Sequence, residues 1–172
     1  MRQIIPIICF IAGPILFSCK EKKDITEIQK SYIIIRSAIG HANQIQDSFF
    51  VEAVQRLGEV KYNVDAVVDT KELQILLDRA KASNETEINI IANTKEPDEE
   101  IKYKEKAIQF VKLLNAIYND EFSEFISILN SKPENRFDSC QVLLYEKMRA
   151  MSKAMHDCAD ASASIRKKYD IK

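Results

Sequence analysis

Residues that interrupt helices are scarce in this chain of 172 residues. After residue 18 it holds only two glycines, Gly40 and Gly58, and two prolines, Pro97 and Pro133. A β-sandwich or β-barrel needs many turns, and Gly and Pro are the residues that most often form them. The sequence therefore predicts an all-α fold that is made of a few long helices.

Apolar residues recur at alternating spacings of three and four along four segments, as in helices with one buried face. Because the segments have similar lengths and short connections, we expect an antiparallel up-down-up-down four-helix bundle. The sequence leaves open whether residues 62–69 are helix or loop. The expected helices run from residue 25 to about 57–63, from about 65 or 69 to 93, from about 97 to 130 and from about 134 to 169.

The third of these helices has the clearest expected start. Pro97 suits the first turn of a helix, and the acidic residues 98–100 complement the positive end of its dipole. From Ile101 to Leu129 the apolar pattern continues, so we expect one unbroken helix. Asn115 falls on its buried face, where a single asparagine most often fixes the register or the orientation of a partner helix. A ligand-binding role for Asn115 is the alternative.

The first nineteen residues form a segment of a different kind. Arg2 precedes an apolar run at residues 4–17, which ends in Ser18 and Cys19, and a charged stretch starts at Lys20. A positive residue, an apolar core and a small residue before a cleavage point make up a secretory signal. The run is shorter than the roughly 20 residues of a membrane-spanning helix. The alternatives are an ordinary cleaved signal, in which Cys19 is incidental, and an uncleaved anchor.

The end of this segment, Leu16-Phe17-Ser18-Cys19, resembles the lipobox of bacterial lipoproteins. The resemblance implies cleavage before Cys19 and acylation of that cysteine, by palmitate or a similar chain. Several acyl chains hold a protein stably at a membrane, whereas one holds it only marginally. The implied division is a signal peptide at residues 1–18, a lipidated tether at 19–24 and a helical domain at 25–172.

The residue after the lipobox cysteine bears on the destination. In lipoproteins of bacteria with two membranes, an aspartate at that position often means retention in the inner membrane. Lys20 stands there in this chain, so the resemblance implies the outer membrane rather than the inner one. The domain can face either the periplasm or the cell surface.

The charge balance limits the class of partner. Arg2 is the only charged residue before Cys19, so the mature chain keeps 24 of the 25 basic residues and all 26 acidic ones, a net charge of −2. A nucleic-acid partner usually requires a clustered basic surface, so we expect none. The expected partners are the membrane, through the lipid, and another envelope or exported protein.

The four cysteines do not predict two disulfides. Cys9 leaves with the signal and Cys19 is the expected lipidation site, which leaves Cys140 and Cys158. Both fall on the last expected helix, 18 residues and therefore about 27 Å apart. A disulfide requires Cα atoms within about 7 Å, so they cannot pair with each other. We expect two buried thiols, or one thiol that bridges to another chain.

Sulfur-containing residues also form the one chemically suggestive set, on the last helix beside His156. Thioether and thiolate ligands select Cu(I), so an exported protein could bind copper there. The competing interpretation is core packing, because these residues lie on the buried face and methionine fills irregular gaps. The set consists of Met148, Met151, Met155 and Cys158.

Other chemistry has no visible site. A di-iron bundle needs Glu-x-x-His on two helices, but Ala38 precedes His41 by three residues and Lys153 precedes His156. No nucleophile and base stand at a spacing that helices would bring together. We therefore expect no catalytic residues and no cofactor.

The expected function is that of a non-catalytic binding or adaptor module, with Cu(I) binding as the alternative. The binding residues themselves are not identified by the sequence. An exposed apolar patch would locate a partner surface, for instance around Ile33, Ile34, Phe49 and Phe50.

Overall fold

The structure, a computed structural model, describes residues 24–63, 65–131 and 134–172. The signal segment and Cys19 therefore lie outside the described residues, as do Val64, Lys132 and Pro133. The described part is helical and contains no strand, which confirms the all-α class. Its five helices are α1 (Ile25–Tyr62), α2 (Lys71–Asn93), α3 (Tyr103–Asn119), α4 (Glu121–Ser131) and α5 (Arg136–Tyr169).

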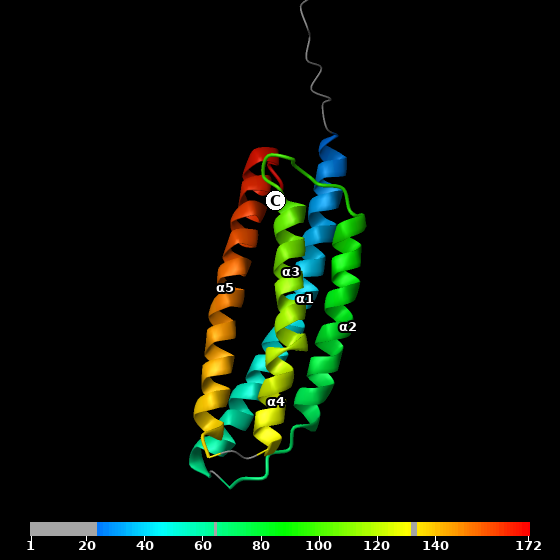
Figure 1. Cartoon of the computed structure of the whole chain (residues 1–172). Coiled ribbons are helices and arrows are strands. Elements are labelled where there is room, and N and C mark those ends of the chain that lie inside the picture. The colour runs from blue at the N-terminus through cyan, green and yellow to red at the C-terminus, as the bar shows by residue number, and fades with distance from the viewer. Residues whose placement is uncertain (1–23, 64, 132–133) are drawn as a thin grey trace, which may run out of the picture.

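The helices form a bundle in which α3 and α4 follow one another nearly in line (Figure 1). Helix α1 packs against α2 and α5, and α3 packs against α2 and α5. The start of α1, the α2–α3 connection and the end of α5 lie at one end of the bundle. These contacts are compatible with the expected up-down-up-down order. Within the described residues, no helix combines the length and the apolar character that crossing a membrane requires.

The third expected helix begins later than the sequence predicted. Its first helical residue is Tyr103, and Pro97 lies in the connection before it. Asp98 is the cause, because its Oδ1 accepts hydrogen bonds from the backbone N–H groups of Glu100 (2.9 Å) and Ile101 (3.1 Å) and so forms a turn. Lys102 then adopts a left-handed conformation, with φ of 58°. The expected start of this helix at Pro97 was therefore wrong.

The same helix is interrupted once, which the sequence did not predict. Helix α3 ends at Asn119 and α4 begins at Glu121, with Asp120 as a turn residue between them. The Ser123 hydroxyl donates to the Tyr118 carbonyl oxygen at 3.1 Å, and such a side-chain bond competes with the regular helix ladder. The buried face nevertheless continues across the break, through Tyr118 and Phe122.

The sequence left undecided whether residues 62–69 are helix or loop, and the structure answers this for all of them except Val64. Helix α1 continues past Gly58, ends at Tyr62 and is followed by Asn63, whose N–H donates to the Glu59 carbonyl oxygen. Residues 65–70 are not helical. Helix α2 begins at Lys71, whose N–H donates to Asp69 Oδ1 at 3.1 Å.

An aromatic cluster fills the middle of the core. The Phe49 and Phe122 rings stack with centroids 4.7 Å apart, and Tyr118 and Phe125 meet Phe49 edge-on. Phe50 packs edge-on against Phe122 and is also buried. The suggested exposed patch was therefore wrong for Phe49 and Phe50, whereas Ile33 is exposed and Ile34 is half-buried.

The apolar pattern predicted a buried face through Phe50, Val54 and Leu57. Phe50 and Leu57 are buried as predicted, but Phe49 and Ala53 are buried as well, whereas Val54 is not.

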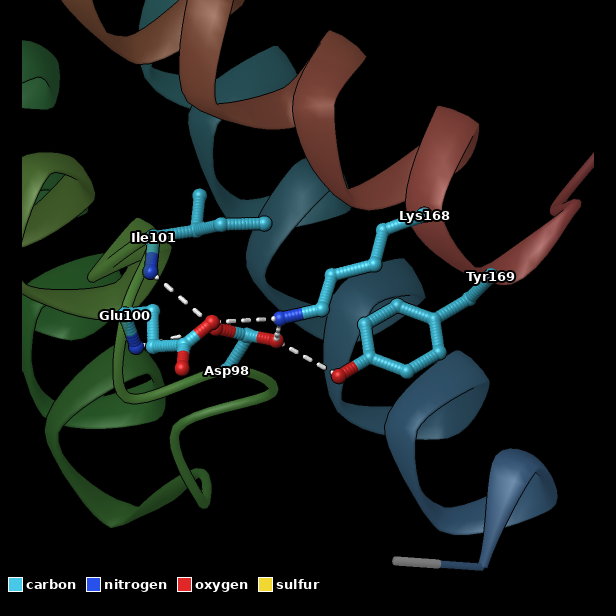
Figure 2. Close-up of polar contacts among 5 residues, drawn as sticks. All are labelled: Asp98, Glu100, Ile101, Lys168 and Tyr169. Atoms are coloured by element: carbon cyan, nitrogen blue, oxygen red, sulfur yellow. Dashed lines mark hydrogen bonds and ion pairs between the residues drawn. The ribbon is translucent and has the colours of Figure 1, made fainter.

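Asp98 also joins the α2–α3 connection to the end of α5 (Figure 2). Its Oδ2 accepts a hydrogen bond from the Tyr169 hydroxyl at 2.5 Å and lies 2.7 Å from Lys168 Nζ. Burial alone would raise the pKa of the Asp98 carboxyl. The hydrogen bonds from Lys168, Tyr169 and the two backbone N–H groups outweigh burial and hold that pKa well below its usual range.

Candidate functional site

The four sulfur-containing residues of the last helix divide into two pairs. Met151 and Cys158 are buried in the core, whereas Met148 and Met155 are 38% and 40% exposed. The Met155 sulfur lies 3.3 Å from Asn43 Nδ2, which donates to it from α1. The structure therefore does not gather the four sulfur atoms at one point.

The two thiols are enclosed by the core. Cys140 and Cys158 are both free and buried, and Cys140 Sγ lies 3.8 Å from the Phe125 carbonyl oxygen. Burial raises the pKa of Cys140 to about 12 and that of Cys158 to about 11. Because the thiolate is the reactive form, both side chains are unreactive near neutral pH. This confirms the expectation of buried thiols.

His156 lies at the surface of the same helix. It is exposed, and its Nδ1 lies 2.8 Å from the Ser152 carbonyl oxygen of its own helix. Within residues 24–63, 65–131 and 134–172, no three His, Cys, Asp or Glu side chains are grouped so that they could hold a metal ion.

An apolar groove lies between α1 and α5, and we call it the α1/α5 groove. It has a volume of about 440 Å³. Two exposed apolar side chains, Val54 on α1 and Tyr145 on α5, stand near it by their positions along the two helices. The groove is lined by Gln46, Asp47, Phe50, Val51, Met148, Ser152 and Met155.

This groove follows from the phase of α1. The buried face of this part of the helix runs through Phe49, Ala53 and Leu57. Val51 and Val54 then fall beside that face and remain exposed on the α5 side. The spacing of three and four residues through Phe50, Val54 and Leu57 predicts Val54 in the core, but its side chain is 51% exposed. The apolar surface on this side of α1 therefore consists of Val51 and of Val54, which the pattern assigned to the interior.

A second groove, the α1/α2 groove, is polar and has a volume of about 320 Å³. His41 and Glu87 face each other across it, with His41 Nδ1 3.3 Å from Glu87 Oε1. The Glu87 side chain is 7% exposed, whereas that of His41 is 64% exposed. Ile45 and Leu76 supply apolar contacts. The polar lining consists of His41, Gln44, Ser48, Arg79, Ser83 and Glu87.

Glu87 was missed by the sequence reasoning, which assigned Ile88 to the buried face. The signal was present, because Glu87 stands three residues after Asn84 and four before Ile91, and both of these are buried. Residues three and four apart share one face of a helix, so Glu87 is placed on the buried face between Asn84 and Ile91. A buried charged group requires hydrogen-bond or ionic partners. The structure places His41 of α1 against Glu87.

Other polar side chains are buried in the core. Asn84 Nδ2, Asn115 Oδ1 and the Tyr118 hydroxyl have no hydrogen-bond partner among the described residues. Burial raises the pKa of the Tyr118 phenol. The Asn115 side chain is half-buried with its oxygen enclosed, and its effect on register stays a prediction.

Arg136 is a buried charge that the sequence did not reveal. Its guanidinium donates to the Leu129 carbonyl oxygen and to the Ala66 carbonyl oxygen, each at 3.1 Å. These bonds join the end of α4, the α1–α2 connection and the start of α5. The arginine therefore closes the end of the bundle that lies opposite to Asp98.

Comparisons of the chain with protein-family models, with curated proteins and with solved structures found no match.

Proposed function

We propose that this chain is a lipid-anchored protein of the cell envelope that acts as a non-catalytic adaptor. Cys19 carries the lipid, the outer membrane is the favoured location, and the α1/α5 groove binds another envelope or exported protein. The domain is an antiparallel up-down-up-down four-helix bundle.

The proposed helix order is supported by contacts at one end of the bundle. Lys95, just after α2, lies 3.1 Å from Glu27 in the first turn of α1. Lys168, in the last turn of α5, lies 2.7 Å from Asp98, which precedes α3. Two helix starts and two helix ends therefore meet at this end, as an alternating order requires.

The lengths support a role away from the membrane surface. Cys19 precedes Asp24 by five residues, so the tether reaches at most about 17 Å. Helix α1 has 38 residues, which makes it about 57 Å long. Val51 lies 26 residues beyond its start, or about 39 Å along the axis. A lipid at Cys19 would hold the α1/α5 groove well above the membrane, where a second protein can reach it.

The observation that carries the adaptor proposal is the group of exposed apolar side chains around this groove. Val51 on α1 lines the groove together with Met148 and Met155 on α5. Val54 on α1 and Tyr145 on α5 are also exposed, and they follow the lining residues along the same two helices. Contiguous apolar surface on a soluble domain often marks a binding site. Methionine adapts its shape to different partners, and helices bind such grooves through one apolar face. The expected partner segment is an amphipathic helix.

A crosslinking pull-down from the protein's own membranes tests this proposal. The full-length lipidated protein should retain a discrete partner, and Val54→Lys should lose it. Ile75→Lys is the matched control, because Ile75 on α2 is as exposed as Val54, at 51%. Equal loss of the partner in both variants, or in neither, would contradict a role for the α1/α5 groove. The Cys19→Ala variant tests whether assembly requires the lipid.

Cu(I) binding is the second candidate, and one observation favours it. The Met148 and Met155 thioethers line the same groove and are partly exposed. Retention of Cu(I) against a competing chelator, lost in a Met148→Leu/Met155→Leu double variant, would support it. Failure of the wild-type protein to retain Cu(I) would rule it out.

A further inference from the structure

Two opposite charges in the α1/α2 groove are not paired with each other. The Glu87 carboxylate is 7% exposed and has its Oε1 beside His41, whereas its Oε2 is buried and has no hydrogen-bond donor. Arg79, on the same helix, is exposed and lines the groove. Within the described part of the chain its guanidinium has no hydrogen bond or ion pair. A carboxylate with one buried oxygen that lacks a donor is costly, so a positive charge placed beside that carboxylate by a ligand would be favoured.

The two charges stand at the ends of one row of side chains. Arg79, Ser83 and Glu87 follow each other at spacings of four residues on α2, so they lie along the same face. Eight residues separate the two charges, which is about 12 Å along the helix axis. On the opposite side of the groove, α1 contributes the side chain of Gln44, which can donate and accept hydrogen bonds.

This arrangement selects among ligand classes. A purely cationic molecule along the groove would meet Arg79, and a purely anionic one would meet Glu87. An apolar molecule would place no positive charge beside the Glu87 carboxylate. A molecule with an ammonium at one end and a carboxylate at the other satisfies both groups. The volume of about 320 Å³ is at the lower end of the range for small-molecule sites.

We propose that the α1/α2 groove binds a short linear zwitterion, of the class of tripeptides with free termini. Its ammonium lies beside the Glu87 carboxylate at the wall of the groove, and its carboxylate accepts from the Arg79 guanidinium. Three extended residues span about 10 Å, which suits the separation of the two charges. Ser83 and Gln44 are positioned to bond the peptide groups between them. This site lies on a different face from the α1/α5 groove, so it does not rest on the adaptor proposal.

Titration calorimetry of the full lipidated chain in detergent micelles tests the proposal, with triglycine as the probe. Triglycine should bind saturably at millimolar concentrations. N-acetyltriglycine, which lacks the ammonium, and triglycinamide, which lacks the carboxylate, should each bind about tenfold more weakly. Absence of saturable binding by triglycine would overturn the proposal, as would equal binding of all three peptides.

Variants assign each end of the ligand. In Glu87→Gln, triglycine should bind no better than N-acetyltriglycine. In Arg79→Gln, it should bind no better than triglycinamide. Glu85→Gln, at an exposed position of the same helix, is the charge-matched control and should bind like the wild type. If Glu87→Gln does not fold, Arg79→Gln decides the question, because Arg79 is exposed. If the Arg79→Gln variant still binds triglycine more tightly than triglycinamide, as the wild type should, the proposal is overturned.

Discussion

Replacing Asp98 by asparagine tests how much the Asp98 contacts stabilise the end of the bundle at which α1 starts. The Asp98 carboxylate accepts hydrogen bonds from Tyr169 and from the N–H groups of Glu100 and Ile101, and it pairs with Lys168. Asparagine keeps an oxygen for the backbone donors. It then presents an N–H₂ group to the Lys168 ammonium and the Tyr169 hydroxyl, so the charge-assisted bonds are lost.

The expected loss follows from the burial of the partners. The ion pair with the exposed Lys168 side chain is screened by water and contributes little. The hydrogen bond between the Tyr169 hydroxyl and the buried carboxylate is of the stronger, charge-assisted kind. We expect Asp98→Asn to lower the free energy of unfolding by about 2 kcal/mol. For a domain of this size, that lowers Tm by about 4–8 °C.

Urea unfolding of the chain from residue 20 onward measures this loss. Glu99→Gln is the matched control, because it makes the same charge change at the next, exposed position, and it should alter stability by less than about 0.5 kcal/mol. Tyr169→Phe removes only one hydrogen bond and should cost about 1 kcal/mol. The reasoning is refuted if Asp98→Asn unfolds at the same urea concentration as the control.

The pH dependence provides an independent check. The folded state holds the Asp98 pKa below its value in the unfolded chain, about 3.9. The stabilisation is therefore fully present above that value. It is lost as the pH falls through about 4 toward the folded pKa, because the unfolded state then binds more protons. The stability difference between wild type and Asp98→Asn should shrink over this range. A difference that is larger at pH 3 than at pH 7 would contradict the sign.

Three further predictions concern the core. Cys140 and Cys158 should resist a thiol reagent at pH 8 in the folded protein and react fully in urea; rapid modification of the native state would contradict their burial. Tyr118→Phe should leave stability unchanged or raise it by up to about 1 kcal/mol, because it removes a buried hydroxyl without a partner, and a clear loss in urea unfolding would reveal a missed bond. Phe122→Ala should cost about 3–5 kcal/mol in the same assay, since it empties the centre of the aromatic cluster, and a loss below 1 kcal/mol would show that the cluster is not well packed.

The sequence predicted the fold class because long apolar periodicity and the lack of helix breakers are local properties. The ends of α1 and α5 were also close to their predicted places, for the same reason. The start of α3 was not predictable in this way. Pro97 and the acidic run fit a helix start by composition, but the tertiary bonds of Asp98 with Lys168 and Tyr169 favour a turn.

The two grooves were less accessible to sequence reasoning. The α1/α5 groove depends on which residues of α1 face the core. Ala53 is buried there, whereas Val54 is 51% exposed and Val51 lines the groove. The α1/α2 groove depends on Glu87 meeting His41 from another helix. The spacing of residues along one helix does not indicate which residue of a neighbouring helix lies opposite them. Lipidation of Cys19 stays a prediction, because that residue lies outside the described part of the chain.

Site-specific photocrosslinking in the native membranes tests the adaptor proposal most directly. A photoreactive residue would replace Met148, in the α1/α5 groove, or Ile75, an exposed apolar position on α2, in the full-length lipidated protein. The account predicts one discrete crosslinked protein from position 148 and none from position 75. The same product from both positions, or from position 75 alone, would contradict the assignment of the α1/α5 groove as the partner surface.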